Sequence, residues 1–363
     1  LLHINGKKIL LECGLFQGRR DDTYEKNKNF RYNPAEIDAL ILSHAHIDHS
    51  GNIPNLVSKG FKGLIYATSA TVDLCQIMLR DSAQLQEKDI EFVNKKRQKK
   101  NEPSLDPLYT LEDVENAMQQ FVGVQYNQAI DLFPGVRFTF RDAGHILGSA
   151  GVQLEVEESG NKKINLGFSG DIGRPDSPVI KSPDILRDLD ILIMESTYGN
   201  RLHSPVEEAE EYFASIIRET VDKGGKVIIP AFAVGRTQTI VYMLHKLSDQ
   251  NRIPEIPIYV DSPLAVDATE VFRSHPECMD RETYRIFLQN HDDPFGFNKL
   301  RYVKKTEESK ELNEKTGSMI IISASGMAEG GRILHHLRHN ISDTKHLILF
   351  VGYAAKHTLA RKI

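Results

Sequence analysis

Hydrophobic residues in the first half of the chain gather in short runs that end at polar residues. Residues 7–12, 37–42 and 63–68 form apolar runs of strand length, and residues 152–158 alternate apolar and polar side chains. A period of two is typical of a half-buried strand, and a short apolar run bounded by turn residues is typical of a buried one. We therefore expect a strand-rich first half, with a helix that opens near Ser69.

The second half of the chain has a different pattern. After residue 200, the strand-like segments KVIIPAF, PIYVD, SMIIISAS and KHLILFVGY alternate with helical ones. Such alternation is typical of βαβ units and predicts a mostly parallel sheet. We expect an α/β protein with one domain at residues 1–199 and a second at 200–363. Residues 81–128 are polar and predicted to be mostly helical, and the basic run at 94–100 is interpreted as a solvated helix end rather than a phosphate-binding patch.

Composition narrows the class of protein. The 363 residues are 40% hydrophobic and 26% charged, which is enough for two or three domains around large cores. A formal net charge of −5 argues against a protein that coats polyanions, but it permits a nucleic-acid enzyme with one basic groove. No apolar run is long enough for a membrane span. The widely spaced Cys13, Cys75 and Cys278 predict free, buried thiols and a reducing cytoplasmic setting.

The segment SHAHIDHSG, residues 43–51, carries the strongest chemical signal. His44, His46, Asp48 and His49 follow one another closely after the apolar run at residues 37–42. Neutral imidazole and carboxylate oxygen are both good ligands for zinc. Histidines two positions apart on an extended loop can face one ion, while the Asp-His pair turns toward a second. A divalent metal site therefore explains the segment better than a polar surface loop does.

Other strands also end at residues that could serve a metal site. Glu12 ends the strand-like segment at residues 7–12, His145 lies in a glycine-rich turn, and Asp171 and Glu195 each follow an apolar segment. A single carboxylate after a strand is usually a cap or turn residue. Histidine or acidic side chains at four strand ends are poorly explained by coincidence. Glu12 is interpreted either as a partner of a metal-binding histidine or as an ordinary strand-end acid.

At this point the chain resembles a known family. SHAHIDHSG, DAGHILGSAG, GFSGDIG and MESTYGN occur in the order seen in the metallo-β-lactamase superfamily, and PAFAVGRTQ and SASGM resemble its β-CASP nuclease branch. The resemblance covers nearly the whole chain. It implies a metallo-β-lactamase αβ/βα sandwich with an inserted β-CASP domain, as in the cleavage and polyadenylation endonuclease and its bacterial and archaeal relatives.

The resemblance also implies roles for individual residues. It assigns His44, His46 and His145 to one zinc ion, Asp48 and His49 to a second, and Asp171 to both. Asp48 would also act in catalysis, and Glu195 would orient a catalytic histidine. Glu12 stands where the branch usually has Asp. Because two later histidines of the family would lie beyond Ile363, we expect that the C-terminal return to the lactamase domain is missing, that the second zinc site is incomplete in this chain, and that the start is clipped as well.

Substrate contacts are expected in the second domain. Ligands of parallel sheets bind beyond the carboxyl ends of the strands, and small residues with arginine near a helix N-terminus suit phosphate. This reasoning selects four candidates: Arg236, Ser323, Ser325 and Arg332. His335, His336 and His339 are interpreted as surface or packed histidines.

These inferences predict a zinc-dependent ribonuclease of RNA processing or decay. Its partner would be single-stranded RNA, with no membrane, and the sequence leaves a homodimer open. The alternatives are a thioester or lactam hydrolase of the same superfamily, which would not need the second domain, and an inactive scaffold subunit, which typically loses metal ligands. The sequence does not decide between RNA and DNA, or between an endonuclease and an exonuclease.

Overall fold

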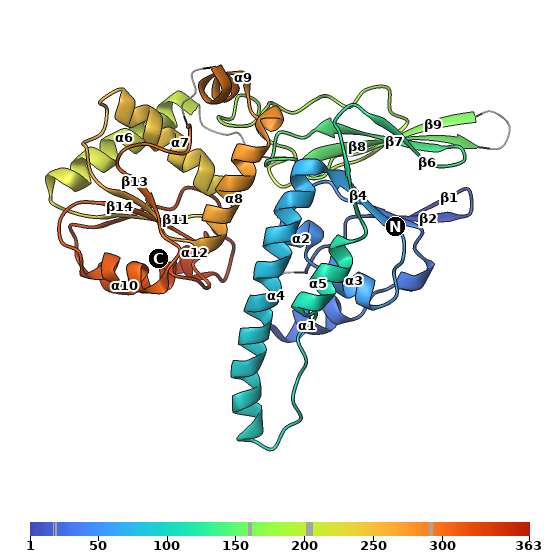
Figure 1. The fold of residues 1–363 in the computed structure, drawn as a ribbon, viewed down its shortest axis with the longest axis horizontal. Coiled ribbons are helices and arrows are strands. Elements are labelled where there is room, and N and C mark those ends of the chain that lie inside the picture. The colour runs from blue at the N-terminus through green and yellow to red at the C-terminus, as the bar shows by residue number, and fades with distance from the viewer. Residues whose placement is uncertain (17, 19, 159–161, 201–205, 290–292) are drawn as a thin grey trace. The chain divides into compact units, whose positions relative to one another are not determined.

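The computed structural model describes two compact units (Figure 1), and its described residues are 1–16, 18, 20–158, 162–200, 206–289 and 293–363. The first unit comprises residues 1–176 and 182–197, and the second comprises 177–181 and 198–363. The chain thus enters the second unit at residues 177–181 and then returns to the first. The prediction of one continuous first domain at residues 1–199 did not include this excursion. Ser177–Lys181 belongs to the second unit because the Val179 N–H donates to the Asp280 carboxylate at 2.8 Å and Ile180 forms a β-bridge with Met279.

The first unit contains two five-stranded sheets, of orders β1-β2-β3-β4-β5 and β10-β9-β8-β7-β6. The first sheet consists of β1 (Leu2–Ile4), β2 (Lys7–Leu11), β3 (Ala39–Ile41), β4 (Leu64–Thr68) and β5 (Phe121–Val124). The second consists of β6 (Ala129–Phe133), β7 (Val136–Asp142), β8 (Ala150–Glu158), β9 (Lys162–Phe168) and β10 (Ile191–Ile193). Strands β2 to β5 run parallel, whereas β6 to β9 are antiparallel.

The two sheets share one hydrophobic core. Ile9 and Ile41 of the first sheet belong to the same buried cluster as Phe138, Phe140 and Val152 of the second. Phe138, Phe140 and Val152 alternate with polar residues or glycine along their strands, so the second sheet turns one apolar face inward, whereas β3 in the first sheet is buried along its whole length. The sheets therefore pack face to face as a sandwich, which places the loops at their ends close together.

Helices accompany the first sheet (Figure 1). They are α1 (Arg20–Lys28), α2 (Ile47–Ser50), α3 (Ile53–Ser58), α4 (Ser69–Gln98) and α5 (Leu111–Met118), with a short 3₁₀ turn at Pro34–Glu36. The hydroxyl of Thr68 caps α4 by accepting from the Thr71 N–H at 3.2 Å. The mostly helical character predicted for residues 81–128 is confirmed by α4 and α5, but the prediction did not include β5. Its Phe121–Val124 segment completes the sheet by pairing with β4, a tertiary contact that outweighs the polar surroundings.

The second unit is built on one parallel sheet of order β13-β12-β14-β11-β15. Its strands are β11 (Val227–Pro230), β12 (Ile258–Val260), β13 (Leu300–Tyr302), β14 (Ile320–Ser323) and β15 (Leu347–Ile348). Its helices are α6 (Val206–Asp222), α7 (Arg236–Asp249), α8 (Pro263–Ser274), α9 (Arg281–Tyr284), α10 (Thr306–Glu314), α11 (Ile333–Asn340) and α12 (Leu359–Lys362), with a 3₁₀ turn at Pro276–Cys278 and a π-helical turn at Arg285–Gln289. The parallel sheet predicted for this half is thus confirmed.

The described helices also bear on membrane association. In the part of the chain that the structure describes, no helix combines the length and apolar character that crossing a bilayer requires.

Candidate metal centre

Two of the clustered histidines are presented by the segment after β3. This strand is fully buried between β2 and β4, so its chain direction is fixed and the next residues emerge at the carboxyl edge of the sheet. His44 is buried, and His46 occupies the N-cap position of α2. Their side chains meet, with His44 Nε2 3.1 Å from His46 Nδ1.

His145 reaches the same place from the second sheet. It lies in the turn between β7 and β8, where its N–H donates to the Ser149 hydroxyl at 2.9 Å. The turn is tied to the start of α4, because the hydroxyls of Thr68 and Thr71 both donate to the Gly148 carbonyl, at 2.6 and 2.9 Å. These bonds direct the His145 ring toward His46, and the nitrogen atoms His145 Nε2 and His46 Nδ1 lie 3.2 Å apart.

Asp171 comes from the loop after β9. This loop packs against the His145 turn through Gly173, whose N–H donates to the Ala143 carbonyl at 2.8 Å. A Cβ at Gly173 would lie 1.6 Å from the Gly144 carbonyl oxygen, so only glycine permits this approach. As a result, Asp171 Oδ2 lies 3.5 Å from His145 Nε2 and 3.9 Å from His44 Nε2.

The four side chains form a group of converging ligand atoms. One potential ligand atom from each of His44, His46, His145 and Asp171 lies within 4.8 Å of all the others. A tetrahedral ion with Zn–N bonds of 2.0–2.1 Å has ligand atoms about 3.3 Å apart. The observed nitrogen–nitrogen separations of 3.1 and 3.2 Å match that spacing. This donor set therefore fits a zinc-sized ion.

Burial keeps these imidazoles neutral. Desolvation, reinforced by the neighbouring histidines, lowers the pKa of His44 well below its usual range. Burial likewise lowers the pKa of His46 to about 3, and it lowers the pKa of His145 although Asp171 and Glu195 oppose that shift. A neutral imidazole offers a free lone pair, which is the form that binds a metal ion.

Glu12 organises the side of the cluster next to His49. Its carboxylate accepts from the Ser43 N–H at 2.7 Å and from the Ser43 hydroxyl at 3.0 Å, and it also contacts His49 Nδ1. Because the Ser43 proton is donated to Glu12, the Ser43 oxygen can accept from His44 Nδ1, 2.9 Å away. One carboxylate thus orients two histidines, His49 directly and His44 through Ser43, and Nε2 of each ring faces Asp171.

His49 has the opposite charge behaviour. Burial opposes its protonation, but interactions with Asp171 and Glu12 outweigh burial and raise the pKa of His49 to about 10. Its Nε2 lies 3.3 Å from Asp171 Oδ1 and 3.9 Å from Asp48 Oδ2. Glu12, His44 and His49 form a second group of converging ligand atoms. Among the described residues, Asp48 belongs to neither group, and its side chain is 56% exposed.

Glu195 supports the loop that carries Asp171. Its carboxylate accepts from the Ile172 N–H at 2.6 Å, and its own N–H donates to the Ser169 hydroxyl at 3.1 Å. Both partners flank Asp171 in the sequence. Glu195 therefore holds the loop at the cluster, a role that the sequence did not reveal.

Comparison with known proteins places this site in a family. A Metallo-beta-lactamase superfamily domain matches residues 1–161, and a Beta-Casp domain matches residues 237–363. Ribonuclease TTHA0252 of Thermus thermophilus is 36% identical over 363 residues, an alignment that covers 100% of this chain and 78% of the relative. The chain belongs to the β-CASP branch of the metallo-β-lactamase superfamily. The predicted resemblance, and with it the expectation of a hydrolase, is confirmed.

Other relatives within the β-CASP branch carry related names. The RNase J-like protein of Methanocaldococcus jannaschii is 34% identical over 359 residues, covering 98% of this chain and 74% of the relative. Transcription termination factor FttA of the same organism is 31% identical over 360 residues, but the chain spans only 54% of its length.

The predicted substrate residues of the β-CASP domain have different environments. Ser323 is buried and donates to the Asp261 carbonyl at 2.8 Å. Arg332 also forms hydrogen bonds within the domain, because it donates to Asp261 Oδ1 at 2.7 Å and to the Val303 carbonyl at 3.2 Å. Arg236 is exposed at the start of α7 and Ser325 is half-buried. A role in substrate binding stays a prediction for all four residues.

A buried polar cluster in the β-CASP domain was missed. Asp261, at the end of β12, accepts from the Ser309 hydroxyl at 2.6 Å and lies 2.6 Å from His336 Nε2. His336 is fully buried, in line with its interpretation as a packed histidine. The sequence contains both the acid of VDSPLA and the histidines of α11, but they lie far apart along the chain, so their spacing does not predict that they contact each other.

Proposed function

We propose that this β-CASP protein is a zinc-dependent ribonuclease that hydrolyses phosphodiester bonds of single-stranded RNA. The convergence of His44, His46, His145 and Asp171 carries the proposal, because these neutral and acidic groups are the ligands that a hydrolytic zinc site requires. RNA is favoured as substrate because relatives that the chain largely covers are named ribonuclease and RNase J-like protein.

Two zinc ions would divide the ligands between them. His44, His46 and His145 would hold the first, Asp48 and His49 would contribute to the second, and Asp171 would contact both. Asp171 supports this division because its two oxygens face different partners: Oδ2 lies near His44 and His145, whereas Oδ1 lies near His49.

The chemistry of such a site is phosphodiester hydrolysis. When bound, two zinc ions lower the pKa of water and stabilise charge on the phosphoryl oxygens. Glu12 keeps the Nδ1 proton of His49 in place, which fixes the orientation of that ring. Asp48, which is exposed beside His49, would accept a proton from the attacking water. Glu195 holds the loop that carries Asp171 through its hydrogen bond with the Ile172 N–H.

Cleavage of RNA by the full-length protein tests the proposal. A single-stranded RNA and a DNA of the same sequence, each labelled at one end, are incubated with the wild type, with Asp171→Ala and with Asp106→Ala, an exposed aspartate outside the cluster. We expect RNA cleavage by the wild type and Asp106→Ala and at least a 10²-fold slower reaction with Asp171→Ala. Equal rates for Asp171→Ala and the wild type would refute it. A ladder of products would indicate an endonuclease, and mononucleotides an exonuclease.

A further inference from the structure

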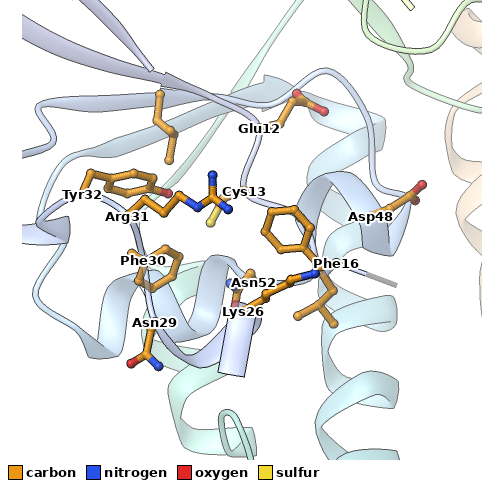
Figure 2. Close-up of a pocket in the computed structure, with 13 residues that line it drawn as sticks. Glu12, Cys13, Phe16, Lys26, Asn29, Phe30, Arg31, Tyr32, Asp48 and Asn52 are labelled. Carbon is orange, nitrogen blue, oxygen red and sulfur yellow. The ribbon is translucent and has the colours of Figure 1, made fainter. Parts of the chain in front are cut away.

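A pocket lies beside the metal centre in the first unit (Figure 2). Its volume is about 320 Å³, and its lining runs from the end of β2 to the segment after α1. Glu12 and Asp48 form part of this lining, and both lie next to His49 at the candidate metal centre. The pocket and the candidate site of hydrolysis therefore share a wall.

Backbone contacts make that shared wall rigid. The N–H groups of Cys13 and Leu15 donate to the carbonyls of His49 and Ile47, at 2.8 and 2.9 Å. Between them, a Cβ at Gly14 would lie 1.6 Å from the Asp48 carbonyl oxygen. The pocket loop is thus pressed onto the helix that presents Asp48 and His49. A ligand held in this pocket would keep a constant position relative to the metal centre.

The side chains around the pocket combine aromatic rings with positive charge. Figure 2 shows the ring of Phe16 on one side, the rings of Phe30 and Tyr32 on the other, and the guanidinium of Arg31 between them. Lys26 adds a second cation, and within the described chain neither Lys26 nor Arg31 forms a salt bridge. Nucleobases stack on aromatic faces, and phosphates pair with unengaged cations.

Phe16 combines a fixed backbone with an exposed side chain at the pocket. The buried side chain of Asn27 accepts from the Phe16 N–H at 2.8 Å and donates to the Phe16 carbonyl at 3.0 Å. The Phe16 ring is nevertheless 60% exposed. Holding a large apolar ring in water serves no packing purpose, whereas a ring fixed in this way is a preorganised stacking surface.

We propose that this pocket binds one nucleotide of the RNA chain next to the scissile phosphodiester, with its base against Phe16 and its phosphate near Lys26 and Arg31. The inference rests on the proposed function, since it names a subsite for that same substrate. A nucleotide matches the pocket better than other ligands do. An apolar ligand would leave Lys26 and Arg31 without an anionic partner, and an inorganic anion would leave the Phe16 ring without a stacking partner.

Two matched pairs of substitutions test the assignment by binding. Phe16→Ala is compared with Phe92→Ala, whose ring is 59% exposed on α4 outside the pocket. Lys26→Ala is compared with Lys28→Ala on the same helix, which changes the net charge equally without altering the pocket lining. Affinity for a labelled single-stranded RNA is measured in a His145→Ala background, which prevents cleavage. His145 is not part of the pocket lining.

We expect Phe16→Ala to weaken RNA binding at least about fivefold, the lower bound for loss of one stacked base. Phe92→Ala should stay within twofold of the parent. Lys26→Ala should weaken binding and reduce its salt dependence more than Lys28→Ala does. If Phe16→Ala and Phe92→Ala bind RNA equally well, the pocket is not a nucleotide site.

A base scan makes the test specific. Replacing each base in turn by fluorescent 2-aminopurine should reveal one position that is quenched on binding in the parent and in Phe92→Ala but not in Phe16→Ala. Removing the base at that position should weaken binding by the parent as much as Phe16→Ala does, and should add little to the Phe16→Ala defect. Additive losses, or no position with Phe16-dependent quenching, would overturn the assignment.

A further substrate separates this inference from the proposed function. An RNA with an abasic residue at the position found by the base scan lacks the ring that would stack on Phe16, so enzymes with and without Phe16 should cleave it at equal rates when His145 is intact. If the wild type leaves RNA uncut, the proposed function fails. If the wild type cuts RNA and Phe16→Ala binds it with undiminished affinity, only the pocket assignment fails.

Discussion

At the scale of single residues, the metal centre depends on an acid that is not one of the histidines' obvious neighbours. Glu12 has a left-handed backbone, with φ of 64°, and its carboxylate contacts Ser43 and His49. Burial raises the pKa of Glu12, although its hydrogen bonds with His49 and Ser43 oppose that shift. Since the same carboxylate contacts His49 directly and His44 through Ser43, removing its charge should affect the whole cluster.

Glu12→Gln keeps the shape of the side chain and removes its charge. We expect a tenfold to 100-fold loss of zinc affinity, the usual effect of losing a partner behind a metal-binding histidine. Affinity is measured by competition with a chromogenic chelator. Glu36→Gln is the control, because Glu36 is an exposed acid that contacts Lys8. A Glu12→Gln protein with wild-type zinc affinity would show that Glu12 does not orient the site.

The histidine loop could be predicted from the sequence, because it places four potential metal ligands within six residues. The role of Ser43 could not. A serine beside a histidine is common, and only the folded structure shows that its hydroxyl connects Glu12 to His44. The sequence also did not show that Ser323 and Arg332 both donate hydrogen bonds to Asp261, because residue type alone does not reveal a partner that is distant in the chain.

At the scale of elements, the centre requires two loops from the second sheet to touch. Gly173 lies against the Gly144 carbonyl, and this contact brings Asp171 to His145. Gly173→Ala should push the loops apart, lower zinc affinity at least about tenfold and cost about 1–3 kcal/mol of stability. Chelator competition and thermal unfolding measure the two effects.

The control for this substitution is Gly352→Ala, because a Cβ at Gly352 would meet nothing within 4 Å. It should leave zinc affinity and stability unchanged. Tight zinc binding by Gly173→Ala would mean that the loop contact is not needed to place Asp171.

In the β-CASP domain, Asp261 directly follows β12 and contacts Ser309 of α10 and His336 of α11. Burial disfavours the charged Asp261, but hydrogen bonds from His336, Ser309 and Arg332 outweigh burial and lower its pKa below the usual 3.8. A carboxylate with a lowered folded-state pKa adds stability above the unfolded value, and that stability is lost as pH falls below about 4.

Asp261→Asn should therefore destabilise the domain by about 3 kcal/mol at neutral pH, since it leaves Arg332 without its buried partner. The difference from the wild type should shrink as pH falls below about 4. Thermal unfolding across the acid range measures both effects, with the exposed Asp267→Asn as control. A difference that stays constant with pH would contradict the assigned shift.

At the scale of the whole molecule, the sequence was most informative where pattern and chemistry coincide. The parallel sheet of the second unit followed from strict βαβ alternation. Strand β5, the short strand β13 and the brief passage of Ser177–Lys181 into the second unit did not follow. Each depends on pairing between distant segments, which local propensity does not encode. The pocket beside Glu12 was hidden for the same reason.

The central claim is that RNA hydrolysis depends on zinc held by the histidine cluster. The most direct measurement is RNA cleavage by full-length protein that has been stripped with a chelator and then titrated with zinc, for the wild type and for His46→Ala. The account predicts no cleavage by the stripped wild type, a rate that rises and levels off near two zinc ions per chain, and little recovery in His46→Ala. Undiminished cleavage by the stripped wild type, or full recovery in His46→Ala, would contradict it.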